Sequence, residues 1–253
     1  MQEGLRPRVQ EIPKSRKLNP VFWFVNRAIR FYARLTCVID APDLEKVPMH
    51  GPLIVIANHT GQIEVPLLFA YLQPRPLSGW AKVEAWDNWF LRWIFSLWGA
   101  IPLRRGEADI SALKQALRAL DQGYIFGLAP EGTRNKTGKL IRAQPGAVIL
   151  ALRSGAPILP IAHWGGEHHF SNLLRFQRTH FHIRVGEPFT LNTDGVKISG
   201  EVRQQIVDEM MYELAALLPQ GYRGEYMDMN KSTKKYIDRG TTHQPADRQL
   251  AEL

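Results

Sequence analysis

The chain has 253 residues, of which 45% are hydrophobic and 22% charged, and its formal net charge is +8. This apolar content is enough for a sizeable buried core, which excludes a disordered chain. The single cysteine, Cys37, excludes an internal disulfide framework and a cysteine-based zinc finger. The basic balance favours an anionic partner: nucleic acid, an anionic membrane surface or a phosphorylated substrate.

The N-terminus lacks the pattern of a secretory signal. Residues 1–20 hold five Lys/Arg and three Pro, and no continuous apolar run occurs before Val21. Nowhere does the chain approach about 18 uninterrupted apolar residues, so we expect no membrane-spanning helix. We expect the protein to be made and kept in the cytosol.

Residues 21–35 predict an amphipathic helix. Arg27, Arg30 and Arg34 share one helical face. The opposite face carries apolar residues, namely Val21, Phe24, Ala28, Phe31 and Leu35. Such a helix can lie in a membrane interface, or it can pack on the domain with its arginines in water, and both interpretations stay open.

Strands and helices then alternate along the chain. Short apolar runs predict strands, and helical periodicity or capping signals predict helices. The expected strands are 53–58, 100–103, 124–129, 157–163 and 180–185, and the expected helices are 66–71, 86–98, 110–123, 146–153 and 198–217. The helix at 86–98 is rich in tryptophan, which suits lipid headgroups or a core, and we favour the core.

This alternation predicts the fold class: a single α/β domain with a mixed, largely parallel sheet flanked by helices, plus the N-terminal amphipathic helix. We divide the chain into a basic membrane-association segment (1–36), the main domain (37–221) and a polar, pattern-free segment (222–253). We expect the last of these to be a mobile tail.

Polar residues follow several of the predicted strands. Ligands bind beyond the carboxyl ends of the strands in open α/β sheets, so these residues are candidates for a site. They are His59 and Glu64, Arg104 and Arg105, Glu131 to Arg134, and His163 with His168. We expect a histidine, two carboxylates and three arginines to meet at one edge of the sheet.

His59 and Glu64 suit a base and the carboxylate that orients it. A neutral imidazole takes a hydroxyl proton, and a carboxylate on its other nitrogen fixes the tautomer. The spacing alone is weak, since His182 and Glu187 share it on a strand. The alternative is a turn histidine bonded to the backbone, with Glu64 as a first-turn acid favoured by the helix dipole.

Residues 130–134 read P-E-G-T-R. Gly132 lets the backbone approach a ligand, Thr133 can cap a helix, and Arg134 can bind a phosphate with two hydrogen bonds. The alternative is a solvated basic turn.

A metal site at His163, Glu167, His168 and His169 is disfavoured by the adjacent Gly165-Gly166. No nucleotide-binding glycine motif, G-x-S-x-G elbow or nucleic-acid reader motif occurs, and we expect no nucleic-acid partner.

Four segments in order resemble the motif blocks of the lysophosphatidate (1-acylglycerol-3-phosphate) acyltransferases. They are N-H-T-G-Q-I-E (58–64), G-A-I-P-L-R-R (99–105), P-E-G-T-R (130–134) and A-P-I-L-P-I-A (156–162). The similarity covers residues 50 to 190, and the third block is the most specific.

The resemblance implies a peripheral enzyme on the cytoplasmic side of a membrane. It would move a fatty acyl group from acyl-CoA or acyl-carrier protein to the hydroxyl of a lysophospholipid at the phospholipid surface, without a metal or bound cofactor. By motif match, His59 would be the base and Glu64 its partner. The acceptor-phosphate site would be lined by Arg105, Glu131, Gly132, Thr133 and Arg134. Pro157 and Pro160 would lie near the acyl-donor channel.

The chain departs from the family pattern at three places. Glu64 stands where the family usually has Asp, and Gly61 where Ser is common. Leu103-Arg104 stand where the second block has an acid or aromatic residue. Two alternatives follow: an acyltransferase acting on another lipid acceptor, or a non-catalytic membrane-surface lipid-binding protein whose site has drifted. Nucleic-acid binding through the basic surface is a third, and it predicts a steep salt dependence of duplex affinity.

Overall fold

The computed structural model describes residues 19–61, 63–106, 108–135 and 137–240. Within them, the main sheet has seven strands in the order β1-β7-β6-β2-β5-β3-β4. The strands are β1 (Cys37–Asp40), β2 (Leu53–Ala57), β3 (Leu77–Lys82), β4 (Ile101–Leu103), β5 (Ile125–Leu128), β6 (Ile158–Trp164) and β7 (Thr179–Val185). A separate pair joins β8 (Thr190–Leu191) and β9 (Ile237–Asp238).

The sheet is mixed and largely parallel, which confirms the predicted fold class. Strands β6, β2, β5, β3 and β4 run in one direction. Strand β7 pairs antiparallel with β6, and β1 pairs parallel with β7 at the edge. All five predicted strands are present as β2, β4, β5, β6 and β7.

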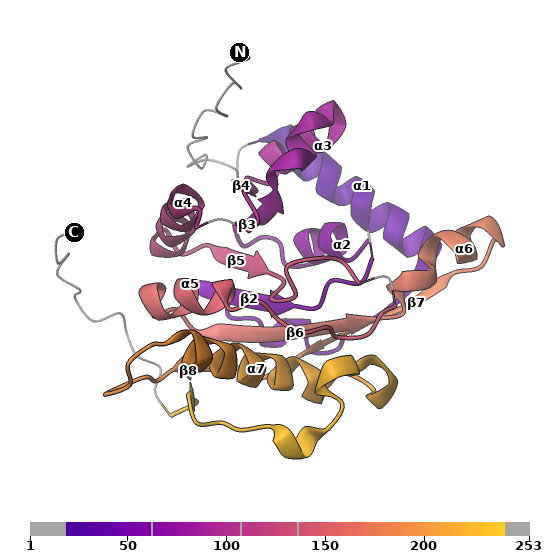
Figure 1. Cartoon of the computed structure of the whole chain (residues 1–253). Helices are drawn as coiled ribbons and strands as arrows, with labels where there is room; N and C mark the ends of the chain where they lie inside the picture. Colours follow the sequence, from indigo (N-terminus) through magenta and orange to yellow (C-terminus); the bar gives the residue numbers. More distant parts are fainter. Residues whose placement is uncertain (1–18, 62, 107, 136, 241–253) are drawn as a thin grey trace, which may run out of the picture.

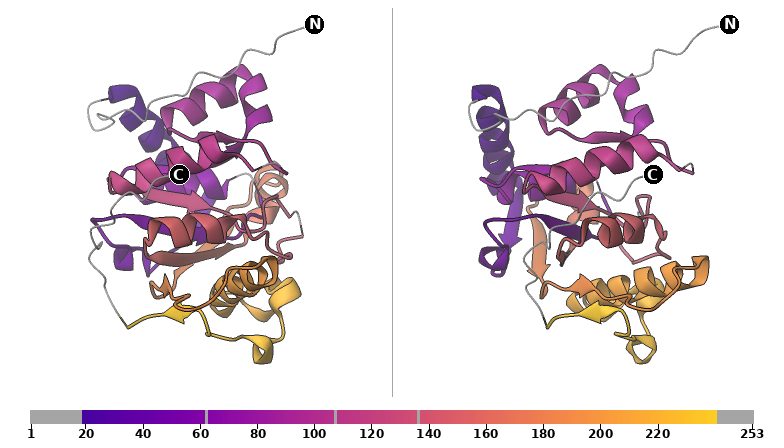
Figure 2. Two further views of the ribbon diagram at one scale, coloured as in Figure 1. Left: turned by 60° about the vertical axis from the view of Figure 1, so that its left-hand side comes forward. Right: turned by 90° about the vertical axis from the view of Figure 1, so that its left-hand side faces the viewer.

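Helices cover both faces of the sheet (Figure 1). They are α1 (Pro20–Thr36), α2 (Glu64–Tyr71), α3 (Trp89–Leu97), α4 (Ile110–Asp121), α5 (Gly146–Ser154), α6 (His169–Leu174) and α7 (Gly200–Leu217). Side chains of β2 alternate between the two layers. Ile54 and Ile56 pack with α4, α5 and α7, whereas Leu53 and Val55 pack with α1 and α2. Figure 2 shows α1 and α7 on opposite sides of the sheet.

Helix α1 turns its apolar face to solvent. It packs on the domain through the buried Phe22, Asn26 and Ala33, while Phe24 is 73% exposed. Phe31 and Leu35 on the same face are also exposed. Arg30 points the other way and donates to the carbonyl of Ala70 in α2 at 2.6 and 2.9 Å. The helix therefore packs on the domain with Arg27 and Arg34 in water, but through Phe22, Asn26 and Ala33 and not through the predicted apolar face.

Helix α3 is exposed as well. Trp89 is 80% exposed, and Phe90 and Trp93 also face solvent, whereas Trp98 just beyond the helix is buried and stacks on Phe69. Core packing, the interpretation we favoured for 86–98, is correct at Trp98 and wrong for the first turns of α3. The helix belongs to the connection from β3 to the edge strand β4.

The segment after Tyr222 is folded up to residue 240, which corrects the expectation of a tail that begins at 222. Strand β9 pairs with β8, and Tyr226 and Tyr236 are buried. The cause lies in α7, where the buried carboxylate of Glu209 accepts the backbone N–H groups of Lys235 and Tyr236, each at 2.9 Å. Residues 241–253, and residues 1–18 of the predicted N-terminal segment, lie outside the described residues.

No helix among the described residues is both long enough and apolar enough to cross a membrane.

Candidate active site

His59 stands two residues beyond β2, at the carboxyl end of a central parallel strand. Its neighbour Asn58 is buried and fixes the start of this turn to β6. The Asn58 amide donates to the carbonyl of His163 at 2.8 Å, and its oxygen accepts the His163 backbone N–H at 3.0 Å. The chain therefore leaves β2 in a defined direction, with His59 above the sheet edge.

Glu64 is the first residue of α2 and meets His59 across the turn. Its Oε1 lies 2.7 Å from His59 Nδ1 and also accepts the backbone N–H of Gly61 at 2.9 Å. The Glu64 side chain is 2% exposed, whereas that of His59 is 21% exposed. With Nδ1 held by the carboxylate, Nε2 is the nitrogen that can meet a substrate. The predicted pair is thus formed.

The Glu64 carboxylate is ionised in this setting. Burial by itself raises the pKa of a carboxyl group, because the charged form loses its water. Here burial is the largest single influence, but the hydrogen bond with His59, the nearby His163 and a backbone hydrogen bond together outweigh it and lower the pKa of Glu64 from 4.5 to about 2. A negative charge beside Nδ1 stabilises the imidazolium that forms when Nε2 takes a proton.

The loop after β5 holds the main chain of His59 from both sides. Glu131 Oε1 accepts the His59 N–H at 2.8 Å, and the N–H of Asn135 donates to the His59 carbonyl at 2.8 Å. Gly132 has φ = 68° in the turn between them, a conformation that favours glycine. Glu131 was predicted to line the acceptor-phosphate site. Its side chain is instead buried and contacts the backbone of the dyad loop.

Burial raises the pKa of Glu131 to about 7, and the negative charge of Glu64 acts in the same direction. The backbone N–H groups of His59 and Ile141 oppose the shift but do not cancel it. Glu131 therefore changes its protonation state near neutral pH, directly beneath the base.

Glu131→Gln is expected to remove one component of the pH dependence of stability. Because folding raises this pKa from 4.5 to about 7, the folded state binds the extra proton, and the wild type loses stability as pH rises through that window. The glutamine cannot ionise but keeps an oxygen for the His59 N–H. The test is urea unfolding of the wild type and the variant across this pH window. An equal fall in their unfolding free energies would contradict the prediction.

The remaining candidates are exposed at the same carboxyl end of the sheet. Arg105 follows β4, an edge strand separated from β2 by β3 and β5, and its side chain is exposed. Thr133 and Arg134 are exposed in the loop after β5. Among the described residues, no hydrogen bond or ion pair joins these three side chains to His59 or Glu64.

Two other sequence candidates have different roles in the structure. His163 lies within β6, is fully buried, and has its pKa lowered by that burial. His182 pairs through Nδ1 with Asp40 at 2.9 Å and not with Glu187. In the described part of the chain, no three His, Cys, Asp or Glu side chains form a cluster that could hold a metal ion.

Sequence reasoning missed Asn58 and Asn135 as positioning residues, and it missed the Gly61 N–H. Asn58 precedes His59 in the first motif block, which was a signal for it. The Gly61 and Asn135 contacts are made by main-chain N–H groups, which side-chain identity does not reveal.

A histidine–carboxylate pair at the carboxyl end of a parallel strand, with the second imidazole nitrogen open, defines an enzyme that uses a general base. The model of the Acyltransferase family matches residues 38–164, which is half of the chain and includes both the dyad and the loop that holds it. The chain therefore belongs to the acyltransferase family and is an O-acyltransferase.

Individual relatives are more distant. The 1-acyl-sn-glycerol-3-phosphate acyltransferase of Bacillus subtilis is 25% identical over 168 residues, which cover 66% of this chain and 82% of that protein. The enzyme of the same name from Pseudomonas aeruginosa is 30% identical over 148 residues, covering 55% and 56%. The crystal structure of the 1-acyl-sn-glycerophosphate acyltransferase PlsC from Thermotoga maritima superposes with a TM-score of 0.59 over 78% of each chain, at 24% identity. It shows the same fold.

Proposed function

We propose that the protein transfers a fatty acyl group from the thioester of CoA or acyl-carrier protein to the free hydroxyl of 1-acylglycerol-3-phosphate. The observation that carries this proposal is the His59–Glu64 pair, with a 2.7 Å bond on Nδ1 and Nε2 on the open side. The relatives named as 1-acyl-sn-glycerol-3-phosphate acyltransferases support the choice of acceptor.

The reaction needs one base and two substrates. His59 Nε2 takes the proton of the acceptor hydroxyl as its oxygen attacks the thioester carbonyl, and a tetrahedral oxyanion forms. The oxyanion collapses, the carbon–sulfur bond breaks, and the thiolate leaves with the proton that His59 returns. The products are an ester and a thiol, and no enzyme-bound acyl group forms. The proposal includes no metal and no bound cofactor.

The other residues position the reactants. Glu131 and Asn135 hold the main chain of His59, so the base is oriented before the acceptor arrives. Arg105 and Arg134, together with Gly132 and Thr133, are our candidates for the acceptor phosphate. This assignment is supported by the two arginines, which are exposed at the same carboxyl end of the sheet. Their guanidinium groups can bind phosphate oxygens there.

The protein would work as a peripheral enzyme on the cytoplasmic side of a phospholipid membrane. Support comes from the exposed apolar face of α1 and from the exposed tryptophans Trp89 and Trp93 of α3. Tryptophan side chains are favoured at the boundary between lipid headgroups and acyl chains. The net charge of +8 favours an anionic surface, and we propose no nucleic-acid partner.

The test is a transfer assay with purified protein, labelled palmitoyl-CoA and 1-acylglycerol-3-phosphate in detergent micelles. We expect labelled phosphatidate, and CoA and carrier-protein donors are compared in parallel. Free fatty acid without transfer would overturn this acceptor, and a panel of other lysophospholipids would then identify the right one. The absence of thioester cleavage with every donor would overturn the enzyme proposal in favour of a lipid-binding protein.

A further inference from the structure

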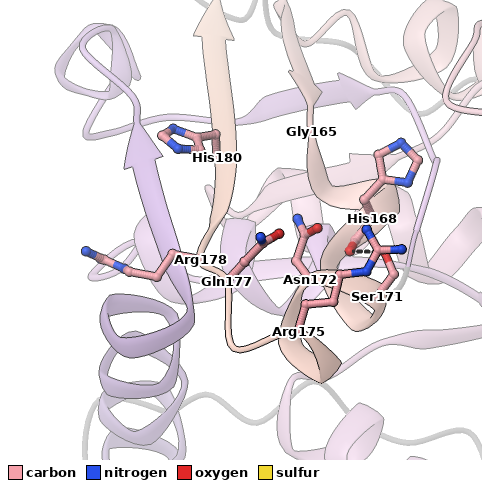
Figure 3. Close-up of a pocket in the computed structure, with 8 residues that line it drawn as sticks. All are labelled: Gly165, His168, Ser171, Asn172, Arg175, Gln177, Arg178 and His180. Atoms are coloured by element: carbon pink, nitrogen blue, oxygen red, sulfur yellow. Dashed lines mark hydrogen bonds between the residues drawn. The ribbon is translucent and has the colours of Figure 1, made fainter.

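A polar cavity, of about 810 Å³, opens between α6, the start of β7 and the turn after β6 (Figure 3). The residues that the structure places around it carry hydrogen-bond donors and positive charge, and no carboxylate is among them. The donors are His168, Asn172, Arg175, Gln177, Arg178 and His180. Guanidinium and amide groups in one cavity suit the oxygens of a phosphate group.

The frame of this cavity is fixed by hydrogen bonds. The Asn172 amide donates to Thr179 Oγ1 at 3.3 Å, and the Gln177 backbone N–H donates to the Asn172 carbonyl at 2.9 Å. Figure 3 shows the amide groups of Asn172 and Gln177 pointing toward the same space. Arg178 donates to the carbonyls of Arg34, at 2.8 Å, and of Cys37, and Figure 3 shows its guanidinium pointing away from the amide groups of Asn172 and Gln177. Arg175 is exposed at the opening.

Exposed apolar side chains are interspersed in sequence with the residues that line the cavity, and we call them the apolar rim. Phe176 is 99% exposed and Leu174 is 83% exposed, and Phe170 and Leu173 are exposed beside them. Phe176 also has φ = 55°, in the left-handed region that a bulky residue adopts only at a cost. Exposure of this apolar rim to water is unfavourable. Its place next to a basic cavity therefore indicates a ligand that carries both an anionic group and apolar chains.

The rim is joined to the exposed face of α1. Tyr32 Oη lies 2.8 Å from His169 Nε2, and Arg178 bonds the carbonyl at Arg34 near the end of the helix. Figure 1 shows α6 beside the end of α1. Phe31 and Leu35 of α1 are also exposed. The two bonds tie the segment that carries the cavity to the end of α1.

We propose that this cavity binds the phosphate of an anionic phospholipid in the membrane while the rim enters the headgroup region. It would be a docking site whose lining does not include His59 or Glu64. The inference rests on the peripheral attachment put forward under the proposed function. Lipid is the occupant that fits, because a free phosphate would leave the exposed rim unexplained.

The experiment measures binding of the full chain to phosphatidylcholine vesicles with and without phosphatidylglycerol, with no acyl donor present. Arg175→Ala should weaken binding to the anionic vesicles about fivefold, which is the effect of one basic residue near such a surface. Phe176→Ser should weaken it about tenfold through lost apolar burial. The matched controls are Arg118→Ala and Ile110→Ser, which change exposed residues of α4 and should bind as the wild type does.

Each other outcome overturns the inference. If Arg175→Ala and Phe176→Ser bind anionic vesicles as tightly as the controls, the cavity is not a docking site, although wild-type binding would still support attachment through α1. If inorganic phosphate binds the protein through Arg175 and vesicles do not, the ligand is a free anion. If Arg175→Ala lowers transfer from carrier protein and leaves vesicle binding intact, the surface receives the acyl donor. The transfer assay of the wild type reports separately on the proposed function.

Discussion

Replacing His59 by alanine is expected to remove acyl transfer almost completely. The substitution deletes the only group placed to take the hydroxyl proton in the proposed reaction, and general-base catalysis contributes about 10²- to 10⁴-fold. The measurement is kcat/KM for phosphatidate formation with labelled acyl-CoA.

The chain supplies a matched control for this variant. His182 also bonds a carboxylate through Nδ1, at 2.9 Å from Asp40, but it lies on β7 away from the dyad. His182→Ala should keep transfer within a few-fold of the wild type. Both variants should unfold cooperatively, since His59 is partly exposed and its loss opens no core. Equal activity of His59→Ala and the wild type would remove His59 from the mechanism.

Glu64→Gln is expected to lower kcat/KM on the order of 10²- to 10⁴-fold with little change in KM for either substrate. The amide keeps the size of the side chain and can accept the Gly61 N–H, but it loses the charge that stabilises the imidazolium. The pKa of Glu64 is lowered to about 2, so the carboxylate stabilises the fold above pH 4.5 and this contribution disappears as pH falls through 2. The unfolding free energy of Glu64→Gln should therefore not show this loss at acid pH. A loss confined to KM would contradict the assigned role.

A second arm of this experiment concerns Gly61, another departure from the family pattern. A Cβ atom at position 61 would lie 3.1 Å from Glu64 Oε2, which is a tight contact. The glycine therefore leaves room for the longer carboxylate. Gly61→Ala should impair the wild-type enzyme and impair Glu64→Asp less, since the shorter side chain withdraws from the added methyl group. Additive effects of the two substitutions would mean that they act independently.

The sequence was sufficient for the parts of the fold that depend on local patterns. Continuous apolar runs such as 53–58 marked the central strands, and capping and periodicity marked the helices between them. The dyad was found because a strand end and a helix start are sequence-local, so His59 and Glu64 could be placed on the same turn. Strands β1 and β3 were missed: β1 has four residues, and β3 reads L-S-G-W-A-K, which has neither an apolar run nor regular alternation.

The remaining errors share a long-range cause. Residues 222–240 have no periodicity, yet Tyr226 accepts the N–H of Ala143 and donates to Asp208, both far away in sequence. Two isolated tyrosines and a buried carboxylate on α7 hold this segment, and none of them forms a local pattern. Arg105 was expected beside the dyad because it follows a strand. Strand order, which local patterns do not specify, separates β4 from β2, whereas Arg134 follows β5, the neighbour of β2.

The junction between α1 and the sheet has a mechanical consequence. The helix ends at Thr36 and β1 begins at Cys37, so no hinge residue lies between them. Arg178 and the Tyr32–His169 contact brace this corner from the other side. The helix and the sheet therefore tilt as one unit. A flat surface on which α1 rests would set the height and angle of His59 above that surface. The position of His59 relative to the acceptor would then depend on how α1 lies on that surface, and not on the length of a flexible linker.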